Sequence, residues 1–213
     1  MKYVCFDFDG TLADSFDFIL YSFDKFFYEN LGIHMDLELF NKLSGPTEEG
    51  FLIKAFKEKY NPKYWNQYLE LYKREANQHI KLFPGIRDML DNLLKLNYKL
   101  IFLTGRSIET AMISLQDLDL KKYFIAFYGG SKDGCVKDKL LEQVSHDFNT
   151  PTKDLLYVGD SLQDIKDAKK AGANIVSVLF SNPSWWECIK ANNSNYVLNV
   201  KDLEEKIVKF MNE

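Results

Sequence analysis

Residues 2–11 of the chain read Lys2-Tyr3-Val4-Cys5-Phe6-Asp7-Phe8-Asp9-Gly10-Thr11. The first part of this stretch is apolar almost without alternation, which is the pattern of a strand buried on both faces, and Asp9-Gly10-Thr11 has the composition of a turn. Strands buried on both faces are typical of parallel sheets. The stretch therefore predicts the first strand of a parallel sheet, with acidic residues at its carboxyl end.

Four more apolar runs follow, and a helical pattern separates each from the next. Glycine and proline mark several helix ends: Pro84-Gly85 precedes one helix, and Gly172 follows another. This alternation predicts an α/β fold with a doubly wound, Rossmann-like parallel-sheet core. The expected strands cover 98–104, 124–128, 155–158 and 175–180, and the expected helices cover 86–94, 107 onward, 136–148, 161–171 and 201–211.

Residues 15–81 differ from the rest because they show helical periodicity and no convincing strand. The aromatic stripe from Phe16 to Phe27 has the spacing of a helix face that packs on other helices. We expect residues 15–81 to form an inserted, all-helical cap domain. Residues 1–14 and 82–213 would then form the α/β core, and the cap would close over it at hinges near Ser15 and Leu82.

Composition and charge limit the classes of partner. The net charge is -4 with both signs interspersed, so no basic field favours nucleic acid or anionic lipid. No apolar run approaches the length of a membrane span. Cys5, Cys135 and Cys188 are odd in number and lack metal-site spacing, which favours a cytoplasmic protein with free thiols. We expect a small-molecule partner, and the sequence leaves a monomer and a homodimer open.

Polar residues directly follow the predicted strands, at the edge where parallel α/β sheets bind ligands. Four of them are acidic, and such a cluster of carboxylates needs a shared cation to offset its repulsion. Oxygen ligands without His or Cys favour Mg²⁺, and a nearby hydroxyl, free N–H groups and a lysine could hold phosphate. The set consists of Asp7, Asp9, Thr104, Gly105, Asp160 and Asp164.

These segments resemble the signatures of the haloacid dehalogenase-like hydrolases, and they occur in the family's order. Residues 7–15, DFDGTLADS, resemble the first signature; residues 103–106, LTGR, the second; and residues 159–165, GDSLQDI, the fourth. Residues 82–85, LFPG, resemble the return of the chain from the cap to the core. The resemblance spans nearly the whole chain.

The resemblance implies a role for each member of the set. Asp7 would be the nucleophile, and Asp9 the general acid and base. Asp7, the backbone carbonyl of Asp9, and Asp160 would bind Mg²⁺, with Asp164 acting through water. Thr104 and the N–H of Gly105 would hold the phosphate. Helix capping is at least as good an explanation for Asp14 and Ser15.

The lysine of the third signature is less clearly marked, because the Lys-Pro pair often seen in the family is absent. Lys137 stands where a helix begins and has apolar residues at the usual spacing behind it. Lys139 would fall inside that helix, and Lys132 in the preceding loop. We therefore expect Lys137 to bind phosphate and take part in catalysis, and we assign no role to Arg106.

Within the family, the acid at position 9 favours phosphate esters, since a carbon–halogen leaving group needs no proton. The resemblance thus implies a phosphoric monoester hydrolase that cleaves a small phosphorylated metabolite through an aspartyl-phosphate. Residues 43–49, LSGPTEE, resemble a substrate-facing loop of phosphoglycolate-phosphatase-like members, but nucleotides and sugar phosphates remain open. A β-phosphoglucomutase-type mutase and a non-catalytic phosphate-binding module are the alternatives. Trp185 and Trp186 could form an interaction patch, but burial against the sheet is the expected arrangement.

Overall fold

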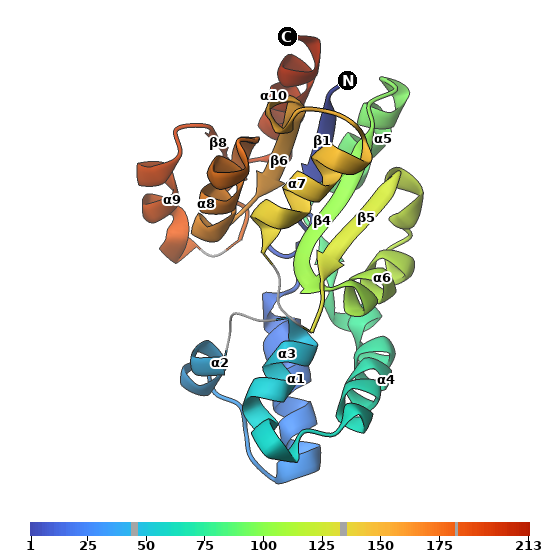
Figure 1. The fold of residues 1–213 in the computed structure, drawn as a ribbon, viewed down its shortest axis with the longest axis vertical. Coiled ribbons are helices and arrows are strands. Elements are labelled where there is room, and N and C mark those ends of the chain that lie inside the picture. Colours follow the sequence, from blue (N-terminus) through green and yellow to red (C-terminus); the bar gives the residue numbers. More distant parts are fainter. Residues whose placement is uncertain (44–46, 133–135, 182) are drawn as a thin grey trace.

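A computed structural model describes residues 1–43, 47–132, 136–181 and 183–213. Within them a parallel sheet with helices on both faces forms one part of the molecule, and a group of helices forms the other (Figure 1). This arrangement confirms the predicted α/β core with a helical cap. Cys135 and three residues of the loop that resembles a substrate-facing segment, Ser44 to Pro46, lie outside the described residues.

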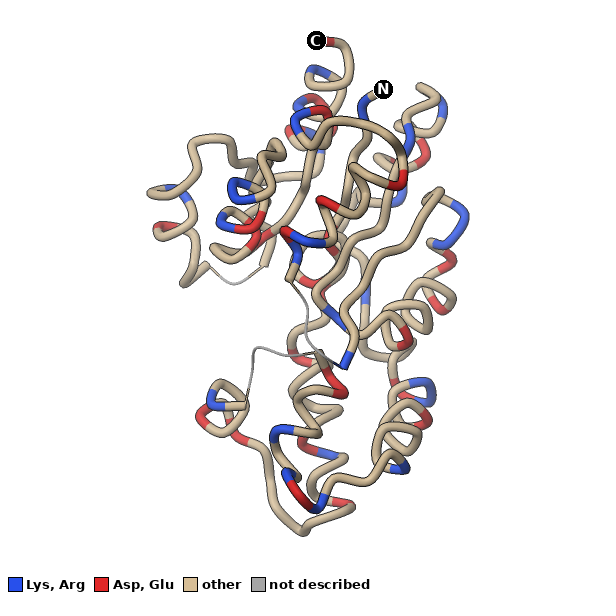
Figure 2. The backbone as a smooth tube through the Cα atoms, in the orientation of Figure 1, with Lys and Arg blue, Asp and Glu red and all other residues tan. Residues whose placement is uncertain are grey.

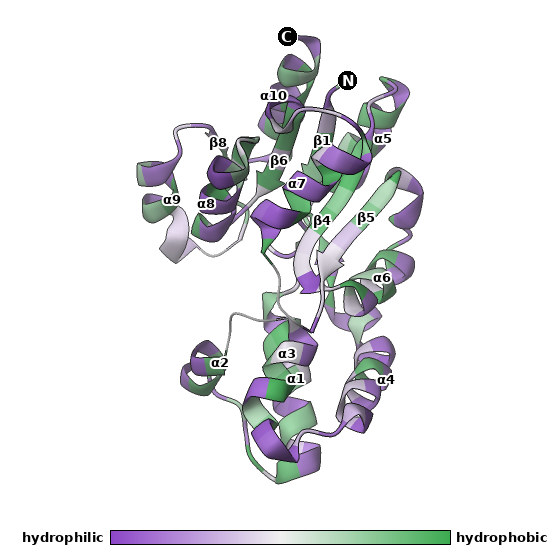
Figure 3. Ribbon diagram, in the orientation of Figure 1, coloured by the Kyte–Doolittle hydropathy of each residue, from purple (hydrophilic) through white to green (hydrophobic). Residues whose placement is uncertain are grey.

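The core sheet has six strands in the order β5-β4-β1-β6-β7-β8, and every neighbouring pair is parallel. The central position of β1 agrees with its continuous apolar sequence, and Figure 3 shows hydrophobic residues concentrated in the middle of the sheet. The strands are β1 (Tyr3–Phe6), β4 (Leu100–Ser107), β5 (Ala126–Gly130), β6 (Leu155–Gly159), β7 (Asn174–Val178) and β8 (Tyr196–Val197).

Alternate residues of β1 point to opposite faces of the sheet, as the pleat requires. Val4 and Phe6 join a core cluster with residues of α5, α6 and α10, whereas Tyr3 and Cys5 join a second cluster with residues of α7 and α8. Helices therefore cover both faces. The core helices are α5 (Ile86–Lys95), α6 (Ile108–Asp117), α7 (Lys137–Asp147), α8 (Leu162–Ala171), α9 (Trp186–Asn192) and α10 (Val200–Asn212).

The cap packs around an aromatic core. Phe23 and Phe26 of α1 contact Tyr68 of α4, and Phe23 stacks on Phe51 of α3 with ring centroids 4.1 Å apart. The spacing in the sequence correctly predicted this packing for most of the stripe, but Phe16 stays 39% exposed. The cap helices are α1 (Phe16–Leu31), α2 (Leu37–Leu43), α3 (Glu48–Phe56) and α4 (Pro62–His79).

Two short segments link cap and core. β2 (Ala13–Asp14) and β3 (Lys81–Leu82) pair antiparallel, so the chain leaves and returns side by side. These two-residue strands were not predicted, because they are too short to show a hydrophobic period. Acidic and basic residues are interspersed along the backbone of both parts (Figure 2), in keeping with the mixed charge of the sequence.

Candidate active site

Three buried carboxylates meet at the carboxyl edge of the sheet. Asp7 follows β1, Asp160 follows β6, and Asp164 lies in the first turn of α8. One carboxylate oxygen from each lies within 4.8 Å of the others, and all three residues are less than one-tenth exposed. The parallel register of β1 and β6 produces this convergence, since both strands end at the same edge.

Lys137, the first residue of α7, reaches into this cluster. Its Nζ forms ion pairs with the carboxylates of both Asp7 and Asp164. The second oxygen of Asp7 accepts the Phe8 N–H at 2.7 Å, so both of its oxygens are held in place. Of the three lysines considered from the sequence, the structure brings Lys137 to the acids. Lys139 instead pairs with Glu142 on the exposed side of α7, and Lys132 is exposed.

Asp164 is the most extensively bonded of the three acids. Besides Lys137, it accepts hydrogen bonds from the Asp160 N–H, the Ser161 N–H and hydroxyl, and the Tyr157 hydroxyl at 2.7–3.1 Å. Ser161 and Asp164 also form a capping box at the start of α8. Asp164 therefore both caps a helix and belongs to the acidic cluster.

The charge balance of the cluster suits a bound cation. Burial raises the pKa of Asp7 to about 6, even though Lys137 opposes the shift. Burial and then the neighbouring carboxylates of Asp164 and Asp7 raise the pKa of Asp160 well above its usual value. A single lysine thus faces three buried acids. Hard carboxylate oxygens with an uncompensated negative charge are the donor set that Mg²⁺ prefers, so these residues fit the predicted ion.

Asp9 lies beside this cluster and is a quarter exposed. Its Oδ1 accepts hydrogen bonds from the Ser15 hydroxyl and, at 3.3 Å, from Arg106 Nη1. Ser15 occupies the N-cap position of α1 but makes no side-chain capping bond. The capping explanation for Ser15 was therefore wrong, because its hydroxyl is turned toward Asp9 instead.

Arg106 and Glu48 form a buried ion pair that links core and cap, with Arg106 Nε 2.9 Å from Glu48 Oε1. Glu48 also accepts the Ser107 N–H at 2.7 Å and the Thr110 hydroxyl at 2.6 Å. Burial raises the pKa of Glu48, but Arg106 and these hydrogen bonds outweigh it and hold the pKa below its usual value. The guanidinium also lies 4.9 Å from the Tyr72 ring centroid.

No individual role was predicted for Arg106 or for Glu48, although Glu48 belongs to the segment that resembles a substrate-facing loop. Arg106 and Glu48 are 58 residues apart, and no local pattern connects the end of β4 with the start of α3. The signal that could have found them is chemical: Arg106 directly follows a ligand-edge strand and must be neutralised when buried.

Thr104 and Gly105 stand at the same edge of the sheet, near the end of β4. Thr104 is fully buried, and its hydroxyl oxygen accepts the Arg106 N–H at 3.3 Å. Gly105 lines a cavity of about 730 Å³ between core and cap. Asp7, Asp9, Lys137 and Asp160 line the same cavity. The structure thus gathers five of the residues selected from the sequence around one space. Thr104 and Asp164 do not line it: Thr104 precedes Gly105 in the chain, and Asp164 pairs with Lys137.

Aromatic residues of both core and cap also line the cavity, and Trp185 is one of them. Trp185 is 44% exposed, so the prediction that it is buried against the sheet was wrong. It lies in a short 3₁₀ turn before α9 rather than in a strand or long helix, and this turn brings its ring out toward the cap. Trp186 does pack against the core, in a small cluster with Ile165, Leu179 and Ile189.

The family model of the haloacid dehalogenase-like hydrolases matches residues 4–178. The chain belongs to this family. A phosphoglycolate phosphatase of Aquifex aeolicus is 28% identical over 99% of this chain and 100% of its own length. A 5'-nucleotidase of Pseudomonas aeruginosa is 26% identical over 82% of this chain and 81% of its own length.

A solved structure of this fold gives the same assignment. A crystal structure described as a predicted phosphatase from Clostridium acetobutylicum is 25% identical, covers 98% of both chains and superposes with a TM-score of 0.77. The chain is therefore a phosphatase of the haloacid dehalogenase-like family, a phosphoric monoester hydrolase. Among the described residues, no helix combines the length and apolarity needed to cross a lipid bilayer.

Proposed function

We propose that this phosphatase requires Mg²⁺ and hydrolyses a small phosphorylated metabolite through an aspartyl-phosphate formed on Asp7. The observation that carries the proposal is the buried cluster of Asp7, Asp160 and Asp164 facing Lys137 at the edge of a cavity. Such a cluster provides a nucleophile, ligands for a hard cation and a positive group for phosphate in one place.

In the first step, a carboxylate oxygen of Asp7 attacks phosphorus, and the bond from phosphorus to the ester oxygen breaks. Asp9 donates its proton to that oxygen, so that the leaving group departs as an alcohol. In the second step, Asp9 takes a proton from water, whose oxygen attacks phosphorus and releases Asp7 and inorganic phosphate. The contacts of Ser15 and Arg106 with Asp9 Oδ1 orient this carboxylate for both transfers.

Several chain groups would hold the charge of the transferring phosphoryl group. Asp7, the carbonyl of Asp9, and Asp160 would bind Mg²⁺, with Asp164 acting through water, and the ion supplies neutralisation of the developing negative charge. Lys137 would hold a phosphate oxygen next to Asp7, and Thr104 and the Gly105 N–H would hold others. Burial already holds the Thr104 side chain in place, so it would not have to change position as the transition state forms.

The substrate classes proposed are a phosphoglycolate-like compound, a nucleotide or a sugar phosphate. The named relatives, a phosphoglycolate phosphatase and a 5'-nucleotidase, support two of them. The proposal also places the enzyme in the cytoplasm, as a monomer or homodimer. Free Cys5 and Cys188 support a reducing compartment.

The test is release of inorganic phosphate from a panel of metabolite phosphates, with Mg²⁺ and with a chelator, beside the Asp7→Asn variant. We expect release to need the metal and to fall by at least about 10⁴-fold in the variant, because an amide oxygen is a poor nucleophile. Metal-independent release, or an active variant, would refute the mechanism. Transfer of phosphate between positions of one sugar, without net release, would identify a mutase.

The Asp9→Asn variant separates the two steps. With p-nitrophenyl phosphate, whose leaving group needs no proton, we expect a burst close to one equivalent of nitrophenol followed by a much slower rate. The reason is that Asp7 can still attack, whereas the water that must hydrolyse the aspartyl-phosphate has lost its base. Mass spectrometry of the stalled protein should find one phosphoryl group on the peptide that contains Asp7. Its presence on any other peptide contradicts the assignment.

A further inference from the structure

The aromatic wall of the cavity points to a class of substrate, if the phosphatase activity proposed above is correct. Trp185, Phe16 and Phe40 come from the core, the start of α1 and α2. The Phe16 ring lies edge-on to both others, with centroids 6.3 Å from Trp185 and 6.1 Å from Phe40. These three rings, called here the aromatic wall, thus span the junction between core and cap.

Two of the three rings of this wall remain exposed among the residues that the structure describes. Trp185 and Phe16 are 44% and 39% exposed, although they line a cavity rather than lying singly on the outer surface. Exposed aromatic rings grouped in a concave site usually bind a ligand, because burying them against it recovers the free energy of apolar burial. The wall and the carboxylates of Asp7 and Asp160 line the same cavity, so the part of the substrate that could contact the wall is the group that leaves with the ester oxygen.

The charges around the cavity favour an uncharged leaving group over an anionic one. Among the described lining residues only Arg106 and Lys137 are cationic, and carboxylates of the chain pair with both. The lining also includes Asp14 and Asp17, at the start of the cap. A second carboxylate or phosphate on the substrate would meet acids there, whereas hydroxyl and amino groups would find hydrogen-bond acceptors.

The volume of the cavity sets the scale of the leaving group. At about 730 Å³ it lies within the range of roughly 300–1,000 Å³ typical of pockets that enclose drug-sized molecules. A two-carbon leaving group such as glycolate would leave most of this space to water. A ribose with an attached heteroaromatic ring has the size, the hydroxyl groups and the flat face that the site offers.

We infer that the aromatic wall binds an uncharged leaving group that carries a planar aromatic ring, so that nucleoside 5'-monophosphates are the preferred substrate class. The ring of the base packs on Trp185 and Phe16 while the 5'-phosphate lies at Asp7. Stacking of a base on an aromatic side chain commonly contributes enough to change binding by about tenfold or more. Phe16 and Phe40 belong to the cap and Trp185 to the core, so the base of the nucleotide would contact both parts of the molecule.

The experiment compares adenosine 5'-monophosphate with ribose 5-phosphate, which share the phosphoester and the ribose and differ only in the base. We expect kcat/KM to favour the nucleotide by about tenfold or more. Trp185→Leu should reduce this ratio by about tenfold, whereas Trp185→Phe should keep most of it by preserving a ring. Tyr28→Leu is the matched control, because Tyr28 is an exposed aromatic residue of α1, 55% exposed, that does not line the cavity.

The outcomes separate this inference from the proposed function. Equal or better turnover of ribose 5-phosphate, or a preference for phosphoglycolate or phosphocholine, overturns the inference and leaves a phosphatase. An unchanged ratio in a folded Trp185→Leu protein also overturns it. If no phosphate ester is hydrolysed, the proposed function fails as well. Binding of adenosine, measured by quenching of tryptophan fluorescence in wild type and its loss in Trp185→Leu, would support the wall without relying on turnover.

Discussion

At the scale of single residues, the site depends on how closely backbone and carboxylates approach. Gly10 has φ of +68°, and a β-carbon built on it would lie 1.9 Å from Asp160 Oδ2. Only glycine adopts this left-handed conformation without strain and leaves room for the Asp160 carboxylate. The turn after β1 is therefore shaped by the acid that follows β6, two segments that are distant in the sequence but adjacent in the sheet.

Replacing Gly10 tests whether that contact serves the site. We expect Gly10→Ala to abolish measurable turnover, because Asp160 must move away from Asp7 to make room for the methyl group. The strained φ should also lower the free energy of unfolding by about 1–2 kcal/mol. Gly32→Ala is a matched control with φ of +67° and nothing within 4 Å of the added carbon. It should lose similar stability and keep full activity. Turnover in Gly10→Ala equal to that of the control would show that the contact is dispensable.

At the scale of secondary structure, the long elements could be predicted from the sequence and the short ones could not. The longer core strands and helices carry enough residues to show a period, so their positions were predicted to within a few residues, whereas the seven-residue α9 was not predicted. β2, β3 and β8 have two residues each, which is too few to show a hydrophobic period. Asp7, Asp9 and Asp160 were found because each follows a strand. The pairing of Arg106 with Glu48 was not predicted, because it depends on how α3 packs against the end of β4.

Removal of the Glu48 charge tests that docking. A buried charge that loses its partner commonly costs about 3 kcal/mol, so Glu48→Gln should lower the free energy of unfolding by about that amount at pH 7. The pKa of Glu48 is lower in the folded chain than its ordinary value of 4.5. Its contribution is thus complete above about pH 4.5 and is lost as the pH falls through the folded value.

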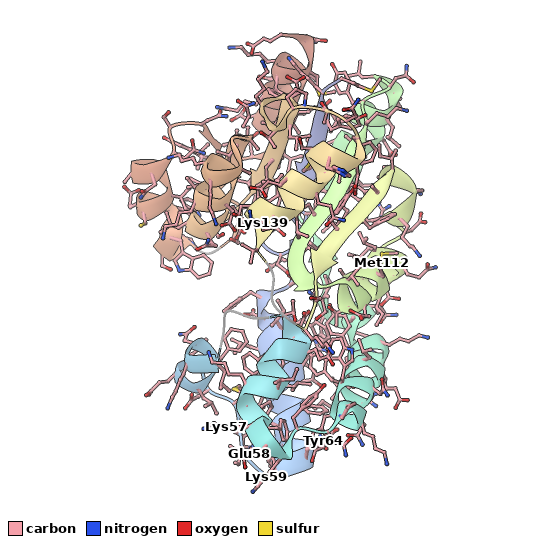
Figure 4. All side chains as sticks on the ribbon, in the orientation of Figure 1. Lys57, Glu58, Lys59, Tyr64, Met112 and Lys139 are labelled. Atoms are coloured by element: carbon pink, nitrogen blue, oxygen red, sulfur yellow. The ribbon has the colours of Figure 1, made fainter. Side chains whose placement is uncertain are left out.

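The measurement is urea unfolding of wild type and Glu48→Gln between pH 3 and pH 7. The difference between the two proteins should be largest at pH 7 and shrink below about pH 4.5. Glu58→Gln is the control, since Glu58 lies at the end of the cap farthest from the core (Figure 4). It should leave stability unchanged at every pH. A difference for Glu48→Gln that stays constant with pH would show that the charge of Glu48 is not what stabilises the docking.

At the scale of the whole molecule, the cavity lies between two parts that the β2–β3 pair connects. Substrate must enter a space walled by the acidic cluster on one side and by the cap on the other. The cap touches the core at several points besides the β2–β3 pair, including a hydrogen bond of 2.8 Å from the Thr47 hydroxyl to the Ser131 carbonyl. We therefore expect each turnover to require that these contacts break and form again.

Locking one of these contacts tests the need for opening. A disulfide between Thr47→Cys and Ser131→Cys, in a chain whose Cys135 and Cys188 are replaced by serine, would hold the cap against the core. Oxidation should lower kcat/KM by about tenfold or more, because substrate entry becomes limiting, and a reducing agent should restore it. The Thr47→Cys protein without the second cysteine should not respond to oxidation. If the cross-linked protein turns over its substrate at the rate of the reduced one, the cavity is reached without movement of the cap, and the β2–β3 pair is a fixed connection rather than a hinge.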